Sequence, residues 1–151
     1  MEIKYLLTDD KNLDFQNLIN KLEKYYISLN KDLALQYQDI NKITKKHYVC
    51  IAYYNEIAIA CGSFKIYDEN TVEMKKFYVL SEYQNQGIGS NILKKLENHA
   101  KSLGYNKVLL ETGCILPKAI SFYKKRNYKI IENFDEFKDD ENIVCMKKEL
   151  K

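Results

Sequence analysis

Hydrophobic residues recur at helical spacing near the start of the chain. Over residues 15–29 they stand three or four positions apart, which is the period of one face of an α-helix. The stripe consists of Phe15, Leu18, Ile19, Leu22, Tyr26 and Leu29. A short apolar run over residues 3–8 predicts a strand before it, ending at Asp9 and Asp10, which favour a helix cap. A weaker helical pattern over residues 33–43 predicts a second helix.

Three β-rich runs follow, over residues 47–54, 57–67 and 71–80. Asn55 and Glu56 separate the first two runs and predict a hairpin. A short polar turn leads into the third run. We therefore expect three antiparallel strands in the middle of the chain.

The second half alternates helical and strand patterns. A strong apolar stripe over residues 88–103 predicts a helix, and Gly104 follows where a left-handed residue commonly ends one. Pro117 opens another helix that extends to residue 126, since proline is favoured at the first helical position. The remaining strands are expected near residues 107–112, 128–133 and 142–148.

This order of elements predicts an α/β (α+β) fold with helices flanking one mixed sheet. Strands and helices alternate too irregularly for a doubly wound sheet, and the helices exclude a sandwich. No linker, repeat or low-complexity tract interrupts the 151 residues. We therefore expect residues 1–151 to form a single domain.

Composition narrows the class of protein. Hydrophobic residues make up 46% and charged residues 30%, which predicts a folded globule. The net charge of +3 comes with scattered lysine pairs, so we expect solvated surfaces and no nucleic-acid partner. No run approaches the ~18 apolar residues of a membrane span, and the start lacks a signal-peptide core, so we expect a cytoplasmic protein without a membrane partner. The four cysteines are widely spaced and fit neither a zinc site nor a disulfide scaffold.

The most informative motif is Gln-Asn-Gln-Gly-Ile-Gly at residues 84–89, between a strand and a strong helix. The amides of a helix N-terminus attract anions, and glycines let a phosphate approach the backbone. A glycine turn that binds nothing is the alternative. A Walker A loop would need Lys-Ser/Thr where Ser90 and Asn91 stand, and a dinucleotide fingerprint would need glycine in place of Ile92.

Residues 73–90 closely resemble the acetyl-CoA signature of the GNAT superfamily of N-acetyltransferases, Gln/Arg-x-x-Gly-x-Gly/Ala, here carried by Gln84, Gly87 and Gly89. The resemblance extends to residues 110–113, 119–128 and 144–150. It implies a GNAT-like, mostly antiparallel sheet of about seven strands with about four helices. It also implies that the strands at 71–80 and 107–112 run parallel and splay at one end to open a cofactor slot.

The resemblance assigns the binding of acetyl-CoA, as co-substrate, to two segments. The loop would hold the pyrophosphate, and the edge of the preceding strand would pair with the pantetheine arm. The loop residues are Gln84, Asn85, Gln86, Gly87, Ile88, Gly89 and Ser90, and the strand residues are Phe77, Tyr78 and Val79. A bulge in that strand would free the Phe77 amide to polarise the thioester carbonyl.

Direct acetyl transfer to an amine needs a group that removes the ammonium proton and one that protonates the leaving thiolate. Glu73 matches the position of a catalytic glutamate in some family members, with a solvated or ion-paired carboxylate as the alternative. Tyr123 resembles the family tyrosine whose hydroxyl lies beside the CoA sulfur, with a core tyrosine as the alternative. His47 and His99 look isolated along the sequence.

We therefore expect an acetyl-CoA-dependent N-acetyltransferase that acts on the primary amine of a small molecule or peptide, and whether it forms a homodimer stays open. Leu116 stands where the family often has asparagine, which slightly favours a non-catalytic acetyl-CoA-binding module as the alternative. Asn127 replaces the usual glycine after the last helix, a mild change because asparagine tolerates the left-handed region.

Overall fold

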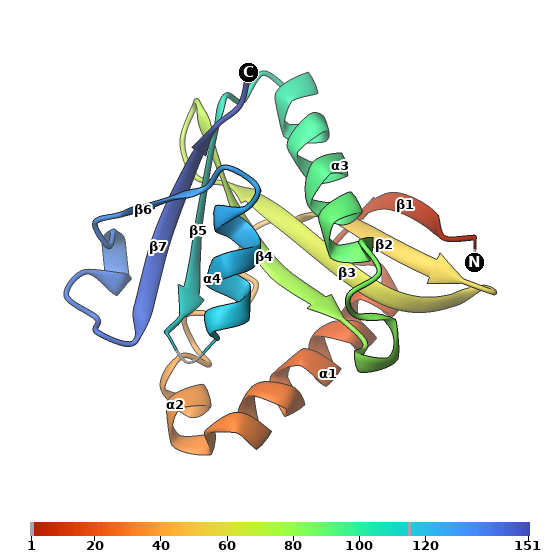
Figure 1. The fold of residues 1–151 in the computed structure, drawn as a ribbon, viewed down its shortest axis with the longest axis horizontal. Helices are drawn as coiled ribbons and strands as arrows, with labels where there is room; N and C mark the ends of the chain where they lie inside the picture. Colours follow the sequence, from red (N-terminus) through yellow and green to blue (C-terminus); the bar gives the residue numbers. More distant parts are fainter. Residues whose placement is uncertain (1, 115) are drawn as a thin grey trace. The chain divides into compact units, whose positions relative to one another are not determined.

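A computed structural model describes residues 2–114 and 116–151 (Figure 1). Within these ranges the chain forms seven strands and four α-helices. The strands are β1 (Lys4–Asp9), β2 (Tyr48–Tyr54), β3 (Ile57–Ile66), β4 (Thr71–Val79), β5 (Lys107–Gly113), β6 (Lys129–Ile131) and β7 (Ile143–Glu149). The helices are α1 (Leu13–Leu29), α2 (Lys31–Gln36), α3 (Ile88–Ser102) and α4 (Pro117–Lys124), with short 3₁₀ turns at Ser81–Tyr83 and Asp135–Phe137.

The strands form one mixed sheet in the order β1-β2-β3-β4-β5-β7-β6. β2 pairs antiparallel with both β1 and β3, and β7 pairs antiparallel with both β5 and β6. β4 and β5 are parallel, and their pairing joins Thr71, Val72 and Glu73 to the first residues of β5. Among the described residues, this pairing covers the start of β4 and not its full length. The seven-stranded, mostly antiparallel α/β fold is confirmed.

Two compact units divide the chain, and each is described by itself. The first contains residues 1–65 and 75–98, and the second contains residues 66–74 and 99–151. The boundary falls inside β4, so this strand contributes residues to both units. The glycine loop belongs to the first unit, whereas α4 and β5 to β7 belong to the second.

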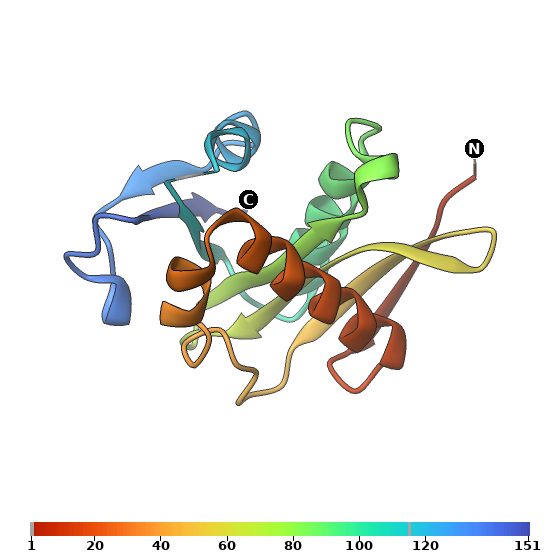
Figure 2. The ribbon, with the colours of Figure 1, turned by 90° about the horizontal axis from the view of Figure 1, so that it is seen from below.

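Two faces of the sheet in the first unit are covered by different helices (Figure 2). On one face, Phe15, Leu18 and Ile19 of α1 pack into a buried cluster with residues of β2 and with Cys61 of β3. On the other face, Ile92 of α3 lies against Gly62. Because neighbouring residues of a strand point to opposite faces, Cys61 and Gly62 mark the two sides of β3. The 3₁₀ turn at Ser81–Tyr83 and the glycine loop join the end of β4 to the start of α3.

Local signals explain where several elements begin and end. Asn55 and Glu56 both adopt positive φ, at 48° and 66°, as a tight hairpin turn requires. Gly104 has a φ of 98° after α3, and the Tyr105 N–H donates to the Ala100 carbonyl, which is the Schellman pattern at a helix end. Both positions confirm the turns expected from the sequence.

Two boundaries differ from the expectation. The cap of α1 is Asn12, whose side chain accepts from the Phe15 N–H at 3.1 Å, so the predicted cap at Asp9 and Asp10 was wrong. Those aspartates instead accept from the backbone of Lys11 and His47. α2 ends at Gln36, before the stretch of turns that the weak helical pattern had included.

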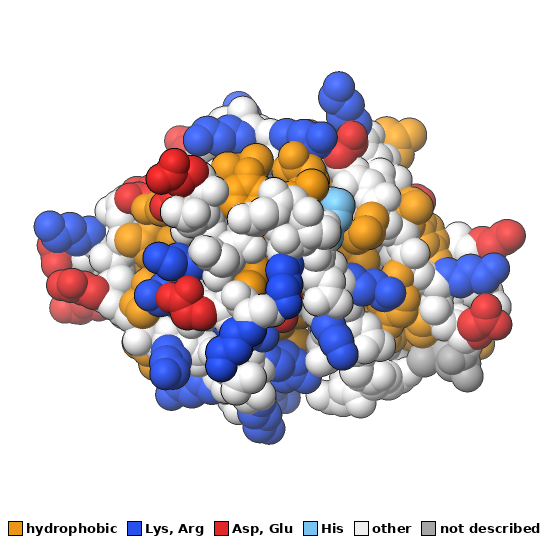
Figure 3. Space-filling model, turned by 90° about the horizontal axis from the view of Figure 1, so that it is seen from above, with side chains coloured by type: hydrophobic (Ala, Val, Ile, Leu, Met, Phe, Trp, Pro, Cys, Tyr) orange, Lys and Arg blue, Asp and Glu red, His pale blue; other side chains and the backbone are white. Residues whose placement is uncertain are grey.

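On the face drawn in Figure 3, acidic and basic side chains are interspersed with hydrophobic ones. In the described part of the chain, no helix combines the length and the hydrophobicity that a membrane crossing requires. Within the same ranges, no cluster of three or more His, Cys, Asp or Glu residues has the arrangement of a metal site. Cys50, Cys61 and Cys145 are buried thiols in strands.

Candidate functional site

The glycine loop leads from β4 into the N-terminus of α3. Asn85 and Gly87 both take the left-handed region, with φ of 63° and 80°. The first bond of the helical ladder runs from the Asn91 N–H to the Gly87 carbonyl at 3.0 Å. The backbone N–H groups of the first turn therefore precede the ladder and point out of the helix end. This geometry, with the positive end of the helix dipole behind it, suits an anion.

Glutamine side chains hold the loop in place. Gln84 donates from Nε2 to the Val79 carbonyl at 3.0 Å, and Gln86 donates to the Glu82 carbonyl at 3.4 Å. The Gln84 side chain thus ties the loop to the end of β4, while residues 84–87 stay exposed. No acidic residue lies in the first turn of α3, so no carboxylate there opposes an incoming anion.

The backbone angle at residue 87 favours glycine, whereas the space around it would accommodate a side chain. A Cβ added at this residue would meet no atom within 4 Å, but a φ of 80° is costly for residues with a side chain. The open space in front of the Gly87 backbone is available to a ligand group. The position therefore combines a left-handed turn with room for a phosphate.

β4 is irregular immediately before the predicted pantetheine segment. Lys76 has a φ of 59° inside the strand, which costs a non-glycine residue about 1–2 kcal/mol. Ser63 Oγ donates to the Lys75 carbonyl at 2.9 Å, and Cys61 Sγ donates to the next carbonyl, that of Lys76, at 3.3 Å. Phe77, Tyr78 and Val79 follow as half-buried residues, and burial raises the pKa of the Tyr78 hydroxyl.

Glu73 lies in the other compact unit, on the part of β4 that pairs with Leu109 of β5. Glu73 is only 4% exposed, which contradicts a solvated carboxylate but not an ion-paired one. A carboxylate at this depth is costly unless it has polar or charged partners. Its presence in a strand core is consistent with a functional position.

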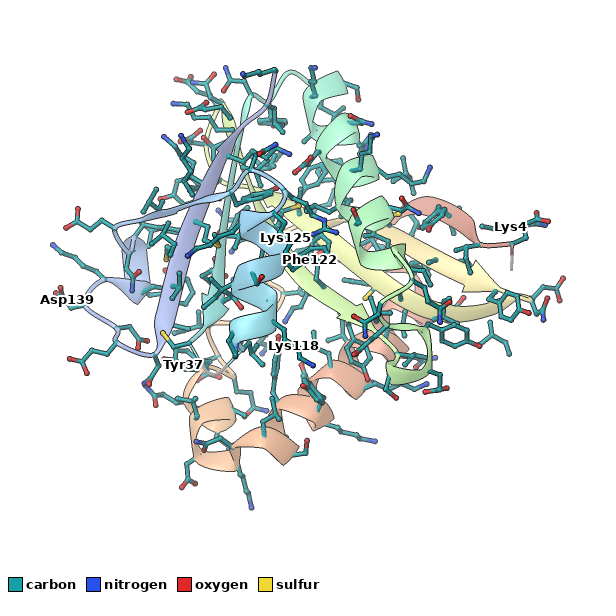
Figure 4. The ribbon with its side chains drawn as sticks, viewed as in Figure 1. Lys4, Tyr37, Lys118, Phe122, Lys125 and Asp139 are labelled. Atoms are coloured by element: carbon teal, nitrogen blue, oxygen red, sulfur yellow. The ribbon has the colours of Figure 1, made fainter. Side chains whose placement is uncertain are left out.

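Tyr123 lies on α4 in the same unit as Glu73 and is 9% exposed. Its ring meets Phe122 and Tyr128 edge to face, with centroids 5.2 and 5.6 Å apart. Phe122 is labelled on α4 in Figure 4, and the Arg126 guanidinium stacks over its ring. Packing therefore fixes the direction of the Tyr123 ring, which suits a positioned hydroxyl as well as a core role.

Asn127 confirms the expected turn after α4, with a φ of 73°. The Tyr128 N–H donates to the Tyr123 carbonyl across this turn. Leu116 is the N-cap residue of α4 and makes no side-chain capping hydrogen bond. The structure thus divides the predicted residues: Glu73 and Tyr123 fall in one unit, whereas the loop and Phe77 to Val79 fall in the other.

Sequence reasoning missed a buried polar network beside the β4 irregularity. His47 is 3% exposed and lies 2.9 Å from Ser63 through Nδ1, so the reading of this histidine as isolated was wrong. Burial, followed by the positive charge of Lys76, lowers the pKa of His47 to about 4. The predicted hairpin was the available signal, because it brings the start of β2 next to the end of β3.

Comparison with known proteins identifies the family model that the sequence matches. Residues 14–128 match the model of the Acetyltransferase (GNAT) family. A relative named Probable N-acetyltransferase 14, from Xenopus tropicalis, is 33% identical over 85 residues, which are 54% of this chain and 41% of that protein. Uncharacterized N-acetyltransferase YsnE from Bacillus subtilis is 27% identical over 92 residues, 60% of this chain and 61% of that protein. The chain thus spans less than two thirds of the length of these two relatives.

A solved structure shares the fold over nearly the whole chain. A GNAT family acetyltransferase from Elizabethkingia anophelis, crystallised with acetyl-CoA bound, superposes with a TM-score of 0.70 and 23% identity. The match covers 98% of both chains.

Proposed function

Because this chain belongs to the GNAT family of acetyltransferases, we propose that it moves the acetyl group of acetyl-CoA directly to a primary amine of a small molecule or peptide. The observation that carries the proposal is the glycine loop at the start of α3. Its left-handed residues Asn85 and Gly87, its exposed backbone and the absence of an acidic residue in the first helical turn all suit a pyrophosphate.

In this proposal the two parts of the first unit have separate binding roles. The amides of residues 85–90 bind the pyrophosphate, and Gln84 keeps the loop against the Val79 carbonyl. The edge of β4 at Phe77, Tyr78 and Val79 pairs with the pantetheine arm in the manner of an added strand. The backbone of β4 and the N-terminus of α3 thus provide most of the contacts to acetyl-CoA, and few side chains are needed for its binding.

The proposed chemistry assigns one role to each of three groups. Acetyl-CoA supplies an acyl group that is activated as a thioester. Glu73 removes a proton from the ammonium so that the amine nitrogen can attack the carbonyl carbon. The Phe77 N–H stabilises the negative charge that develops on the carbonyl oxygen. As the carbon–sulfur bond breaks, Tyr123 gives its proton to the sulfur, since a phenol stays protonated at neutral pH.

The binding half of the proposal is tested with Gly87→Glu. A carboxylate at this position enters the space of the pyrophosphate and repels it, so we expect calorimetry to show no binding of acetyl-CoA. Gly104→Glu is the matched control, because Gly104 also has positive φ and open space around it but lies at the far end of α3. Unchanged affinity in a folded Gly87→Glu variant would place the cofactor elsewhere.

The catalytic half is tested by following CoA release with acetyl-CoA and a panel of polyamines, amino acids, aminoglycosides and peptides. We expect release that depends on at least one amine. Tight binding of acetyl-CoA without release for any amine would instead support a non-catalytic module, the alternative that Leu116 favours.

A further inference from the structure

The left-handed turn at Lys76 is held by side chains of β3. In a regular strand, successive carbonyls point to opposite edges, each toward a different neighbour. Here the carbonyls of Lys75 and Lys76 both accept from side chains of the same strand, Ser63 at 2.9 Å and Cys61 at 3.3 Å. The two bonds are compatible only because the backbone between the carbonyls turns at Lys76. They therefore offset the cost of the left-handed conformation.

These bonds also set the direction of the next amide. The described chain has no cis peptide, and in a trans peptide the N–H points opposite to the carbonyl of the preceding residue. Because the Lys76 carbonyl faces Cys61, the Phe77 N–H points away from that side chain. The bonds at Ser63 and Cys61 consequently orient the amide that the proposed function assigns to the thioester carbonyl.

Behind Ser63 lies a fixed donor, the imidazole of His47. A hydroxyl carries one hydrogen, which Ser63 donates to the Lys75 carbonyl, so Nδ1 of His47 must donate to Ser63 Oγ across their 2.9 Å separation. The backbone N–H of His47 donates to Asp10 Oδ1 at 2.7 Å. Ser63 is 0% and His47 3% exposed, so water does not replace these partners easily.

The opposite face of β3 restrains Phe77 as well. A Cβ added at Gly62 would lie 2.8 Å from two ring atoms of Phe77, so the ring occupies the space that a side chain there would need. Nζ of Lys76 also donates to the Asn41 carbonyl. The irregular segment of β4 is thus fixed from both sides of the sheet.

We propose that Ser63, supported by His47, and Cys61 are positioning residues for acetyl transfer, which fix the left-handed turn at Lys76 and thereby aim the Phe77 N–H. The structural part of this inference stands on the contacts above. Its catalytic part rests on the proposed function.

The test compares three variants of the full chain. Ser63→Ala removes the donor to the Lys75 carbonyl, Ser63→Cys keeps a donor of similar size, and Ile59→Val removes one buried methyl group from the same strand without touching either carbonyl. Carbon chemical shifts of Lys76, measured by NMR on the ligand-free protein, report whether its φ is still left-handed. Turnover is followed as CoA release with the best amine, and acetyl-CoA affinity is measured by calorimetry.

We expect Ser63→Ala to shift Lys76 away from the left-handed conformation. Its kcat should fall about 10- to 100-fold, because a misplaced donor loses most of its effect, while the Kd of acetyl-CoA changes less than about 2-fold. Ser63→Cys should restore most of kcat, and Ile59→Val should lose stability with kcat unchanged. If Ser63→Ala does not fold, Cys61→Ala takes its place with the same expectations.

Three results would overturn the inference. They are a Lys76 that stays left-handed in Ser63→Ala, a kcat of Ser63→Ala equal to that of the wild type, or a loss of kcat in Ile59→Val as large as that in Ser63→Ala. A wild-type protein that neither binds acetyl-CoA nor releases CoA would refute the proposed function instead. In that case the NMR comparison alone decides whether Ser63 holds the turn.

Discussion

The hydroxyl of Tyr123 can be removed while its ring keeps its edge-to-face contacts with Phe122 and Tyr128. We therefore expect Tyr123→Phe to lower kcat by roughly 10²- to 10⁴-fold, the range for acid–base groups, with little change in melting temperature. Acetyl-CoA affinity should change much less, since the hydroxyl acts on charge that develops during the reaction. Steady-state CoA release and calorimetry measure the two effects.

Tyr128→Phe is the matched control, because Tyr128 is also buried and its ring contacts that of Tyr123. It should keep most of the turnover. If Tyr123→Phe turns over as fast as the wild type under conditions where chemistry limits the rate, Tyr123 has only a structural role in the core.

Glu73 is tested through the pH dependence of the reaction. If its carboxylate removes the proton of the amine, Glu73→Gln should lower kcat/KM most at low pH, where few acceptor molecules are neutral. Raising the pH supplies neutral amine and should partly rescue the variant. A ratio of variant to wild-type kcat/KM that stays constant across pH, together with a lower melting temperature, would indicate a structural carboxylate.

At the scale of an element, α1 depends on its cap. The Asn12 side chain accepts from the Phe15 N–H, and α1 then buries Phe15, Leu18, Ile19 and Leu22. Asn12→Ala should cost about 1 kcal/mol in the free energy of unfolding, the usual value of a lost N-cap. For a chain of this size that corresponds to a fall in Tm of about 2–4 °C. Asn12→Asp keeps the acceptor and should retain the wild-type Tm, and equal losses in both variants would argue against the cap.

Most elements could be predicted because their signals are local. Positive φ angles occur in the hairpin at Asn55 and Glu56 and in the turn at Gly104. The residue types at these positions predicted the turns. The cap of α1 was misplaced because three polar residues, Asp9, Asp10 and Asn12, compete over a few positions. Only the folded chain shows that Asp10 is engaged with His47, 37 residues away.

The backbone geometry of the glycine loop was predictable for the same reason. Glycines and the start of a helix identified the loop at residues 84–89, because both act on neighbouring residues. The left-handed angle at Lys76 has no sequence signal of its own, since lysine does not favour it. Its cause lies in β3, in side chains that reach it only through strand pairing. Long-range contacts of this kind cannot be read from local patterns.

The buried histidine makes the stability of the whole molecule depend on pH. An unfolded histidine titrates near 6.5, whereas burial and the charges of Lys76, Lys65 and Lys75, opposed by Asp10, lower the pKa of His47 to about 4 in the folded chain. Between these values the unfolded state binds more protons than the folded state. Stability is therefore fully present above about pH 6.5 and is lost as the pH falls toward 4, by about 3 kcal/mol in total.

Urea unfolding at several pH values, for the wild type and for His47→Gln, measures this effect. Carboxylates titrate in both proteins, so the difference between their unfolding free energies isolates His47. We expect the wild type to lose more stability than the variant between pH 6.5 and 4. Parallel pH curves for the two proteins would show that His47 does not titrate differently on folding.

The contact between Gly62 and the Phe77 ring has a consequence for the evolutionary history of this chain. The Phe77 ring on the neighbouring strand leaves no room for a side chain at Gly62, because an added Cβ would lie 2.8 Å from its ring atoms. Gly62 cannot gain a side chain while the Phe77 ring stays in place, because overpacking a core typically costs about 1–3 kcal/mol. The two sites should therefore covary among homologues, with a larger residue in place of Gly62 accompanied by a smaller one in place of Phe77. Substitutions at this pair would be accepted in a fixed order, the aromatic ring shrinking before the glycine is replaced.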